Sequence, residues 1–373
     1  MFLSRLEIQK FRNLQPAIFE CSPHRNYIFG DNAQGKTNLV EAIYLLCLAK
    51  SFRTREDIDL VPFSEDTYFI EGGFTSDEHI THHVGIMFDA KQGKRIHLDG
   101  KKLNQFSKLV GLFPIIVLSV NDYEITSGPP AQRRRFFNVL LSQSSSRYLD
   151  DLKQYEKVLK QRNTILADIA AGRAQGNNML DVWSDQLVQT GVRLMAARSA
   201  IVEELNHYLA DYYSTITNEK WSFRVVYRPN VEFKQNDVAA RFESALQRTA
   251  FKEKKQGKTL VGPHRDEFIF FISDNDLRKF GSRGEHKSAL VSLKAAEAQV
   301  LYKRTENHPI LLLDDLYAEL DNDRSLKVLN LFDPAGQIFV TGTSLDYAGM
   351  MSSIEHIDDQ TTFMVDNGKI TRV

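Results

Sequence analysis

The stretch that decides the fold of this 373-residue chain is Gly30-Asp31-Asn32-Ala33-Gln34-Gly35-Lys36-Thr37. It matches the pattern GxxxxGK followed by Ser or Thr, in which glycines let backbone N–H groups curl around phosphate oxygens. Lys36 adds a point charge, and the Thr37 hydroxyl can ligate Mg²⁺. A short strand at 27–29 precedes the motif and an amphipathic helix from Thr37 to Lys50 follows it, as the motif requires. We interpret the stretch as a phosphate-binding loop; the alternative is an ordinary Gly-rich turn between a strand and a helix.

A second motif, Ile310-Leu311-Leu312-Leu313-Asp314-Asp315, places two acids at the end of an apolar run. Such runs are typical of strands buried on both faces of a parallel sheet, whose carboxyl ends hold ligands. We expect Asp314 to hold a metal ion together with Thr37, and Asp315 to orient or deprotonate an attacking water as the catalytic base. An Asp can also end a strand for capping reasons alone, and the phosphate-binding loop favours the functional interpretation.

Strand patterns surround both motifs. The runs YFIEGGF, HHVGIMF and RIHL, between residues 68 and 98, are typical of an antiparallel meander, and the last one ends in the turn Asp99-Gly100. Further runs of strand length lie at 3–8, 115–118, 221–227, 268–272 and 337–341. The alternation of such strands with helices predicts an α/β domain.

Helical periodicity takes over after the breaker Ser127-Gly128-Pro129-Pro130. Apolar seams run through 148–169 and 180–208, the first interrupted by Arg162, and the polar loop AGRAQGNN separates them. This pattern predicts an antiparallel helical hairpin, an arm about 40 Å long. We therefore expect residues 1–125 to form the N-terminal part of the α/β head, residues 126–218 an inserted helical arm, and residues 219–373 the C-terminal part of the head.

The composition limits the classes of protein to which this chain can belong. Hydrophobic residues make up 42% and charged residues 25% of the chain, as in ordinary globular proteins. The formal net charge of −1 means that any binding to nucleic acid must come from a local patch. The longest apolar stretch, 42–49, is too short to span a membrane, and the N-terminus has no export signal. The two cysteines have no spacing typical of a zinc site, so we expect reduced thiols in a cytoplasmic protein.

Further residues carry a resemblance to ABC-type ATPases. Leu316-Tyr317-Ala318-Glu319-Leu320-Asp321, after the two acids, is similar to the D-loop, and Gly281-Ser282-Arg283-Gly284-Glu285 is similar to a diverged signature ahead of a helix at 285–303. The ordered set of motifs resembles the RecF family of recombination mediators along essentially the whole chain. The set comprises Phe11-Arg12-Asn13, the loop at 30–37, Gly128-Pro129-Pro130 with Arg133-Arg134, Gly262-Pro263-His264-Arg265-Asp266, the signature and the acidic strand end.

The resemblance implies an ABC-type ATPase head, with a mixed sheet and an antiparallel β meander, and an inserted helical arm domain. It implies ATP and Mg²⁺ as cofactors, with residues 30–37 binding the nucleotide and Lys36 serving catalysis. In such ATPases the signature of one subunit caps the nucleotide of another, so Ser282 and Gly284 are expected to contact the γ-phosphate within an ATP-dependent homodimer. Arg12 and Asn13 are expected to reach the nucleotide, although a solvated strand end is an equally good interpretation.

The chain departs from the ABC pattern in three places. The signature has Arg283 and Glu285 where glycine and glutamine are usual. The strand QIFVT is followed by Gly342-Thr343 without the switch histidine, and Thr341 or Thr343 is expected to replace it. Asp315 is one methylene shorter than the usual glutamate. We therefore expect a weak, DNA-stimulated ATPase that serves as a switch.

The family's partners are gapped, single-stranded and double-stranded DNA and the protein RecR, with support of RecA loading in DNA repair; no membrane is involved. Arg133 and Arg134, and Lys254 and Lys255, are the expected DNA-binding residues, the alternative being solvated charged faces. His264 and Arg265 are expected at the nucleotide or dimer interface.

Three other functions remain as alternatives. A transporter nucleotide-binding subunit should have a standard signature and a switch histidine, and a phosphate-loop kinase would not need an arm. A structural SMC-like protein would need a longer coiled coil than this arm provides.

Overall fold

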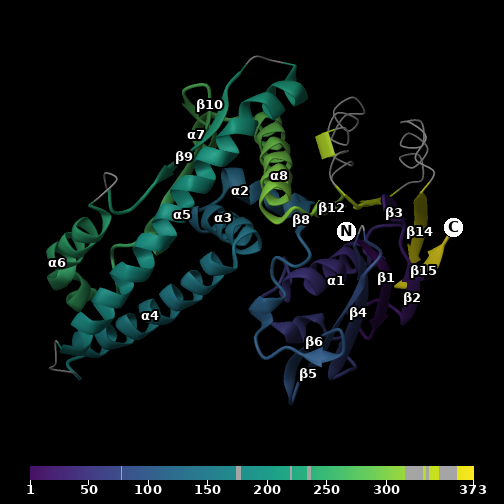
Figure 1. The fold of residues 1–373 in the computed structure, drawn as a ribbon, viewed down its shortest axis with the longest axis horizontal. Coiled ribbons are helices and arrows are strands. Elements are labelled where there is room, and N and C mark those ends of the chain that lie inside the picture. The colour runs from purple at the N-terminus through teal and green to yellow at the C-terminus, as the bar shows by residue number, and fades with distance from the viewer. Residues whose placement is uncertain are drawn as a thin grey trace. The chain divides into compact units, whose positions relative to one another are not determined.

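The computed structural model describes residues 1–76, 78–173, 178–218, 221–232, 237–315, 331–332, 336–343 and 359–373. The chain forms two compact units (Figure 1). Unit 1 comprises Met1–Tyr123, Thr215–Thr217 and Val291–Val373, and unit 2 comprises Glu124–Ser214 and Asn218–Leu290.

A six-stranded sheet forms the core of unit 1, in the order β15-β14-β3-β13-β12-β8. Pairing is parallel from β14 to β8, and β15 is antiparallel to β14. The apolar runs at 310–313 and 337–341, expected to be buried strands, are confirmed as the neighbouring inner strands β12 and β13. The run of strand length at 115–118 forms β8, the edge strand beside β12. The carboxyl ends of β3, β12 and β13 therefore lie at one edge of the sheet. The bounds are β3 Arg25–Phe29, β8 Ile115–Ser119, β12 Ile310–Asp314, β13 Ile338–Gly342, β14 Gln360–Asp366 and β15 Lys369–Arg372.

A second, antiparallel sheet of unit 1 has the order β2-β1-β4-β5-β6-β7, and its strands β4, β5 and β6 are the expected meander. Helix α1, Lys36–Leu48, contacts strands of both sheets. Because it lies between them, eleven of its thirteen residues are buried, where the sequence predicted burial of one face. The bounds are β1 Phe2–Gln9, β2 Ala17–Glu20, β4 Thr67–Thr75, β5 Thr81–Asp89, β6 Gly93–Leu98 and β7 Lys101–Lys102, with 3₁₀ turns η1 Asp57–Leu60, η2 Phe106–Lys108 and η3 Val120–Asp122.

Long helices dominate the middle of the chain (Figure 1). The remaining elements are α2 Tyr123–Ser127, α3 Pro130–Ser144, α4 Ser146–Ala170, α5 Asn178–Thr217, β9 Phe223–Arg228, α6 Val238–Gln256, η4 Pro263–Arg265, β10 Glu267–Ile272, β11 Asn275–Asp276, α7 Leu277–Phe280 and α8 Arg283–Thr305. The side chain of Ser145 caps α4 by accepting a hydrogen bond from the backbone N–H of Tyr148.

The expected helical hairpin is present. Hydrogen bonds join α4 to α5 at positions that move toward the start of α4 as they move toward the end of α5. The bonded pairs are Arg162 with Ser184 at 3.0 Å, Asp151 with Arg193 at 2.7 Å and Tyr148 with Arg198 at 3.4 Å. This register is that of antiparallel neighbours. Arg162, which interrupts the apolar seam, is 3% exposed and donates to the Glu253 carboxylate at 2.6 Å. A buried partner on α6 explains how the seam tolerates a charge.

The compact units divide the chain differently from the expected parts. Unit 2 begins at Glu124, close to the expected start of the arm at 126, but it continues to Leu290 rather than ending at 218. Packing is the reason, because α6 contacts α4 and β10 contacts α3. The described residues between 218 and 290 thus complete the core of unit 2, although the sequence had assigned residues 219–373 to the head.

Candidate functional site

The loop between β3 and α1 has the backbone of an anion cradle. Gly30 and Gly35 have φ of 153° and 120°, and Ala33 between them has φ of 66°. A non-glycine residue rarely adopts such an angle, at a cost on the order of 1 kcal/mol. No side chain of the described residues caps α1, so the N–H groups of its first turn remain available to an anion.

Lys36 is folded into this loop. Its side chain is 4% exposed, and Nζ donates to the carbonyl oxygens of Gly30 at 2.8 Å and Asp31 at 2.9 Å. The ammonium group is therefore held against the backbone that would surround phosphate oxygens.

The two motifs singled out from the sequence meet in space. The Thr37 hydroxyl donates to Asp314 Oδ1 at 3.0 Å across 277 residues of sequence. Thr341 Oγ1 donates to the same oxygen at 2.9 Å and accepts the Asp315 N–H at 2.9 Å. Burial raises the pKa of Asp314, the neighbouring Asp315 adds to the rise, and the two threonine hydroxyls oppose it. Of the two expected replacements for a switch histidine, Thr341 is the one that touches the acidic pair.

The donors around Thr37 fit a magnesium ion. Mg²⁺ prefers oxygen ligands and is usually bound by one or two carboxylates together with substrate phosphates. Thr37 and Asp314 supply one hydroxyl and one carboxylate beside the phosphate-binding loop. Among the described residues, no group of three or more His, Cys, Asp or Glu side chains is arranged to hold a metal ion. Mg²⁺ at this place would therefore draw its other ligands from phosphate and water oxygens, as it usually does.

Asp315, the expected base, adopts φ of 52°, a left-handed conformation that is strained for a residue other than glycine. Its side chain is half-buried beside Asp314. The residues expected to form the D-loop, 316–321, lie outside the described residues.

A cavity of about 340 Å³ adjoins the loop at the carboxyl edge of the core sheet. Thr343, the other expected replacement for the switch histidine, lies in its wall, together with Phe29, Gly30, Asp31, Gln34, Met364, Val365 and Asp366. The cavity therefore brings the loop, the end of β13 and the end of β14 to one place.

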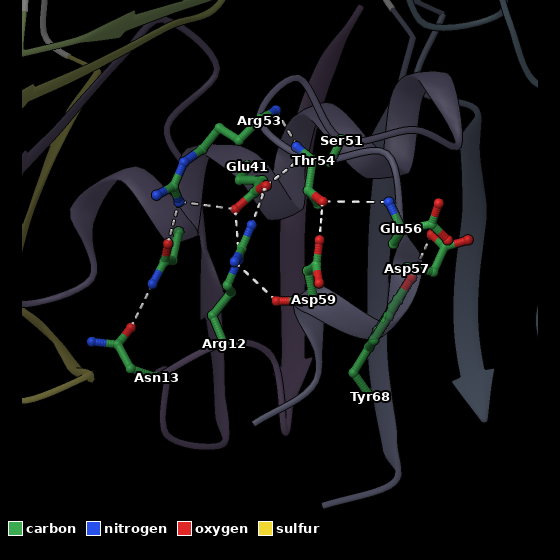
Figure 2. Close-up of polar contacts among 11 residues, drawn as sticks. Arg12, Asn13, Glu41, Ser51, Arg53, Thr54, Glu56, Asp57, Asp59 and Tyr68 are labelled. Carbon is green, nitrogen blue, oxygen red and sulfur yellow. Dashed lines mark hydrogen bonds and ion pairs between the residues drawn. The ribbon is translucent and has the colours of Figure 1, made fainter. Parts of the chain in front are cut away.

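Arg12 is paired within the fold rather than left as a solvated strand end. Figure 2 shows its guanidinium paired with Glu41, with Nε and Nη2 each 2.9 Å from a carboxylate oxygen, while Nη1 donates to the Asp59 carbonyl. The Glu41 side chain is fully buried, and its carboxylate also accepts hydrogen bonds from Arg53 and from the Ser51 hydroxyl. Arg12 is thus engaged by a buried carboxylate, which the sequence did not single out because an acid inside a helix pattern is normally solvated.

Asn13 supports the loop from behind. Its Nδ2 donates to the carbonyl oxygens of Gln34 at 3.2 Å and Ala33 at 3.4 Å, and its Oδ1 accepts from Asn38 at 2.7 Å. The Asn13 side-chain amide thus supports the loop backbone through hydrogen bonds, a contact that the sequence did not predict.

The signature-like segment opens α8. The Ser282 N–H donates to Glu285 Oε2 at 2.7 Å and the Glu285 N–H donates to Ser282 Oγ at 3.3 Å, which is a capping box. Glu285, which departs from the usual glutamine, therefore caps the helix. Ser282 is exposed and Gly284 is half-buried at the N-terminus of this 23-residue helix.

Hydrogen bonds within unit 2 hold the GPHRD motif around its buried aspartate, Asp266. Asp266 is fully buried and accepts from Arg198 at 2.7 Å. His264 Nδ1 lies 2.7 Å from the Tyr155 hydroxyl and Nε2 lies 3.3 Å from the Thr259 carbonyl. Burial lowers the pKa of His264 to about 4, so the ring is neutral. Arg265 is the exposed member of the motif.

The expected DNA-binding residues differ in availability. Arg133 is 3% exposed and bound to Glu267 and to the Gly128 carbonyl, which removes it from the set because its charge is already paired. Arg134 is half-buried and donates to the Asp266 carbonyl at 2.8 Å. On α6, Lys255 is exposed and Lys254 is half-buried.

Comparisons with known proteins show the family to which the chain belongs. The family model described as RecF/RecN/SMC N terminal domain matches residues 2–369. A protein of Halalkalibacterium halodurans named DNA replication and repair protein RecF is 33% identical over the whole length of both chains. The chain belongs to the RecF family. A RecF protein of Staphylococcus aureus, 34% identical, also aligns over the full length of both chains.

Solved structures extend the family assignment to the fold. A structure of the recombination mediator protein RecF with ATP in the RecFOR pathway has a TM-score of 0.91 at 28% identity and covers 100% of this chain and 97% of that chain. A RecF-ATPrS structure of the same pathway has a TM-score of 0.90 at 29% identity, with coverage of 100% and 98%. An Smc head bound to the C-winged helix domain of ScpA, 14% identical with a TM-score of 0.57 and coverage of 100% and 97%, shares the fold alone. The ABC-type ATPase head expected from the sequence is thus confirmed.

Among the described residues, no helix combines the length and the apolar character that crossing a membrane requires.

Proposed function

We propose that this chain is an ATP-dependent, DNA-binding recombination mediator of RecF type, which hydrolyses ATP slowly as a switch. The observation that carries the proposal is the meeting of Thr37 with Asp314 beside the phosphate-binding loop, at 3.0 Å. Relatives named DNA replication and repair protein RecF, and solved RecF structures with ATP, support it. We further propose Mg²⁺ as the cation, RecR as a partner in recognising gapped DNA and supporting RecA loading, and a cytoplasmic location.

The roles follow from the geometry. The amides of residues 30–37 and the Lys36 ammonium bind the phosphates, and Thr37 and Asp314 hold the cation. Mg²⁺, when bound, supplies positive charge that offsets the charge of the phosphate oxygens. Asp315 positions water and accepts its proton as the general base. Thr341 fixes both acids, since it contacts Asp314 and the Asp315 backbone.

ATP would control dimerisation through the signature-like segment. Ser282 is exposed at the N-terminus of a long helix, where backbone N–H groups favour an anion. In the proposed dimer, Ser282 and Gly284 of one copy contact the γ-phosphate held by another. ATP then stabilises the dimer by as much as it binds the dimer better than the monomer, and hydrolysis removes that difference.

Two cationic stripes are the proposed DNA contacts. On α6, Arg248, Lys252 and Lys255 are exposed at spacings of four and three residues, which places them on one helix face. On α4, which packs against α6, three exposed lysines have the same spacing. These are Lys153, Lys157 and Lys160. Clustered charges of this kind bind phosphate backbones even when the net charge of the protein is near zero.

The ATP dependence is tested by fluorescence anisotropy of a labelled gapped duplex, with and without ATP, at one near-physiological salt concentration. We expect tighter binding with ATP, lost in Lys36→Met, because that variant lacks the charge that holds the phosphates. Equal binding with and without ATP would refute the ATP-dependent clamp.

The DNA surface is tested by the salt dependence of the same binding. Each phosphate contact contributes about 0.9 to the slope of log K against log salt, so Lys252→Gln with Lys255→Gln should lower the slope by about 2. The matched control replaces Lys101 and Lys102, exposed on β7 of unit 1, with Gln and should leave the slope unchanged. Equal slopes in both double variants would show that DNA does not follow α6.

A further inference from the structure

The turn between β14 and β15 is a tight hairpin turn. Asp366 pairs with Lys369, so Asn367 and Gly368 form a two-residue hairpin turn. Both have positive φ, 45° and 75°, as a type I′ turn requires and as Asn-Gly readily adopts.

Every backbone N–H and carbonyl group of this two-residue turn makes a hydrogen bond to a segment far away in the sequence. The Asn367 N–H donates to Gln34 Oε1 at 2.5 Å, and the Gly368 N–H donates to the Gln34 carbonyl at 3.1 Å. In the opposite direction, the Asn367 carbonyl accepts from Gln15 Nε2 at 3.1 Å, and the Gly368 carbonyl accepts from the Gln15 N–H at 2.8 Å. The turn is thereby tied to the phosphate-binding loop on one side and to residue 15 on the other.

The same hairpin also meets the start of the loop. Strand β14 pairs with β3, the strand that leads into Gly30. A Cβ built on Gly30 would lie 2.2 Å from the Val365 carbonyl oxygen, and a Cβ built on Gly368 would lie 2.0 Å from the Asn13 carbonyl oxygen. Backbone therefore touches backbone at both places, which leaves the loop little room to move.

These contacts orient the peptide groups of the loop. The Gln34 carbonyl receives the Gly368 N–H and the Asn13 amide together. In a trans peptide the carbonyl and the following N–H point in opposite directions, so the Gly35 N–H is turned away from the hairpin. The contacts also offset the cost of the left-handed Ala33 beside Gln34.

We propose that the β14–β15 turn is a clamp that holds the phosphate-binding loop in its anion-binding conformation, with Asn367 and Gly368 as positioning residues for the triphosphate. The inference rests on the proposed function in that ATP is the ligand whose affinity reports the clamp. It adds a role for the C-terminal hairpin that none of the sequence motifs indicates.

The test compares Gly368→Ala with Gly93→Ala in the full-length protein. Both glycines lie in hairpins of unit 1 and have φ of 75°, so an added methyl group strains both backbones equally. No atom lies within 4 Å of a Cβ on Gly93, whereas a Cβ on Gly368 collides with the Asn13 carbonyl. The pair therefore separates loss of the clamp from ordinary turn strain.

We expect Gly368→Ala to weaken ATP binding at least tenfold, with a larger effect on KM than on kcat, and Gly93→Ala to stay within twofold of the unchanged protein. Hydrogen exchange of the amides at 30–37, measured without nucleotide, should accelerate in Gly368→Ala alone. A Gly368→Ala protein that binds ATP within twofold of the unchanged protein, or whose loop exchanges at the same rate, would overturn the clamp.

Two further measurements keep the inference distinct from the proposed function. If the unchanged protein binds no ATP, the proposed function fails, while the exchange experiment still decides the clamp. If Gly368→Ala does not fold, Gln15→Ala takes its place, because it removes one hydrogen bond to the Asn367 carbonyl and adds no atoms. Faster loop exchange in Gln15→Ala supports the clamp, and unchanged exchange refutes it.

Discussion

Thr341 links the two acids of the site, and its removal gives the sharpest test of that arrangement. Its side chain is fully buried, donates to Asp314 Oδ1 at 2.9 Å and accepts the Asp315 N–H at 2.9 Å. Thr341→Val keeps the shape and removes the hydroxyl. A hydrogen bond to a charged group contributes about 1.5–3 kcal/mol, and an unpaired N–H adds to the loss, so we expect about 3 kcal/mol of destabilisation.

For a unit of this size, 1 kcal/mol corresponds to about 2–4 °C in Tm, so Thr341→Val should melt roughly 6–12 °C lower by calorimetry. Thr341→Ser keeps the hydroxyl and should recover most of the loss, apart from about 1 kcal/mol for one buried methyl group. Thr361→Val is the matched control, because Thr361 is also buried in the core sheet and its side chain makes no hydrogen bond among the described residues. ATP hydrolysis should fall in Thr341→Val and persist in the other two variants. Equal melting temperatures of Thr341→Val and Thr361→Val would refute the reasoning.

Three other predictions concern the base, the signature and a buried histidine. Asp315→Asn should trap an ATP-bound dimer, seen as slower dissociation in size-exclusion chromatography, and normal hydrolysis by this variant would exclude Asp315 as the base. Ser282→Arg should leave ATP binding by the monomer intact and prevent dimerisation, whereas equal loss of both would place the signature on its own subunit's nucleotide. His264 has a pKa of about 4 in the folded protein, against about 6.5 when unfolded, so the unfolded state binds more protons between these values. The free energy of unfolding should therefore fall as the pH drops, by about 2 kcal/mol from pH 7 to pH 5. In thermal melts, His264→Gln should lose less stability over this pH range. Identical pH profiles of Tm for the two proteins would contradict the assignment.

The nucleotide half of the site could be predicted because its chemistry is contiguous. Eight successive residues carry the phosphate-binding pattern, and two acids end an apolar strand, so each motif is complete within a few residues. From the sequence, the residue expected to replace the switch histidine could be narrowed to Thr341 or Thr343, but the choice between them could not be made. The contact of Thr341 with Asp314 depends on β12 and β13 being neighbours in the sheet, which no local pattern states.

Charged residues were the least predictable part. Arg133 and Arg12 are read as available cations when only their neighbours in sequence are considered. In the fold, Glu267 neutralises Arg133 and Glu41 neutralises Arg12, and each partner comes from a distant segment. The buried Asp266 of the GPHRD motif shows the same effect, because Arg198 on α5 supplies its partner.

The amino-acid sequence by itself determined the phosphate-binding loop, the acidic strand end, the buried strands and the helical hairpin, because these depend on residue type and short-range periodicity. Only the tertiary structure decided which polar groups remain free to meet a ligand, where the second unit ends, and that Asn367 and Gly368 reach Gln34. The physical reason is that a hydrogen bond or ion pair is settled by whichever group lies within about 3 Å, and in a folded chain that group can stand hundreds of residues away.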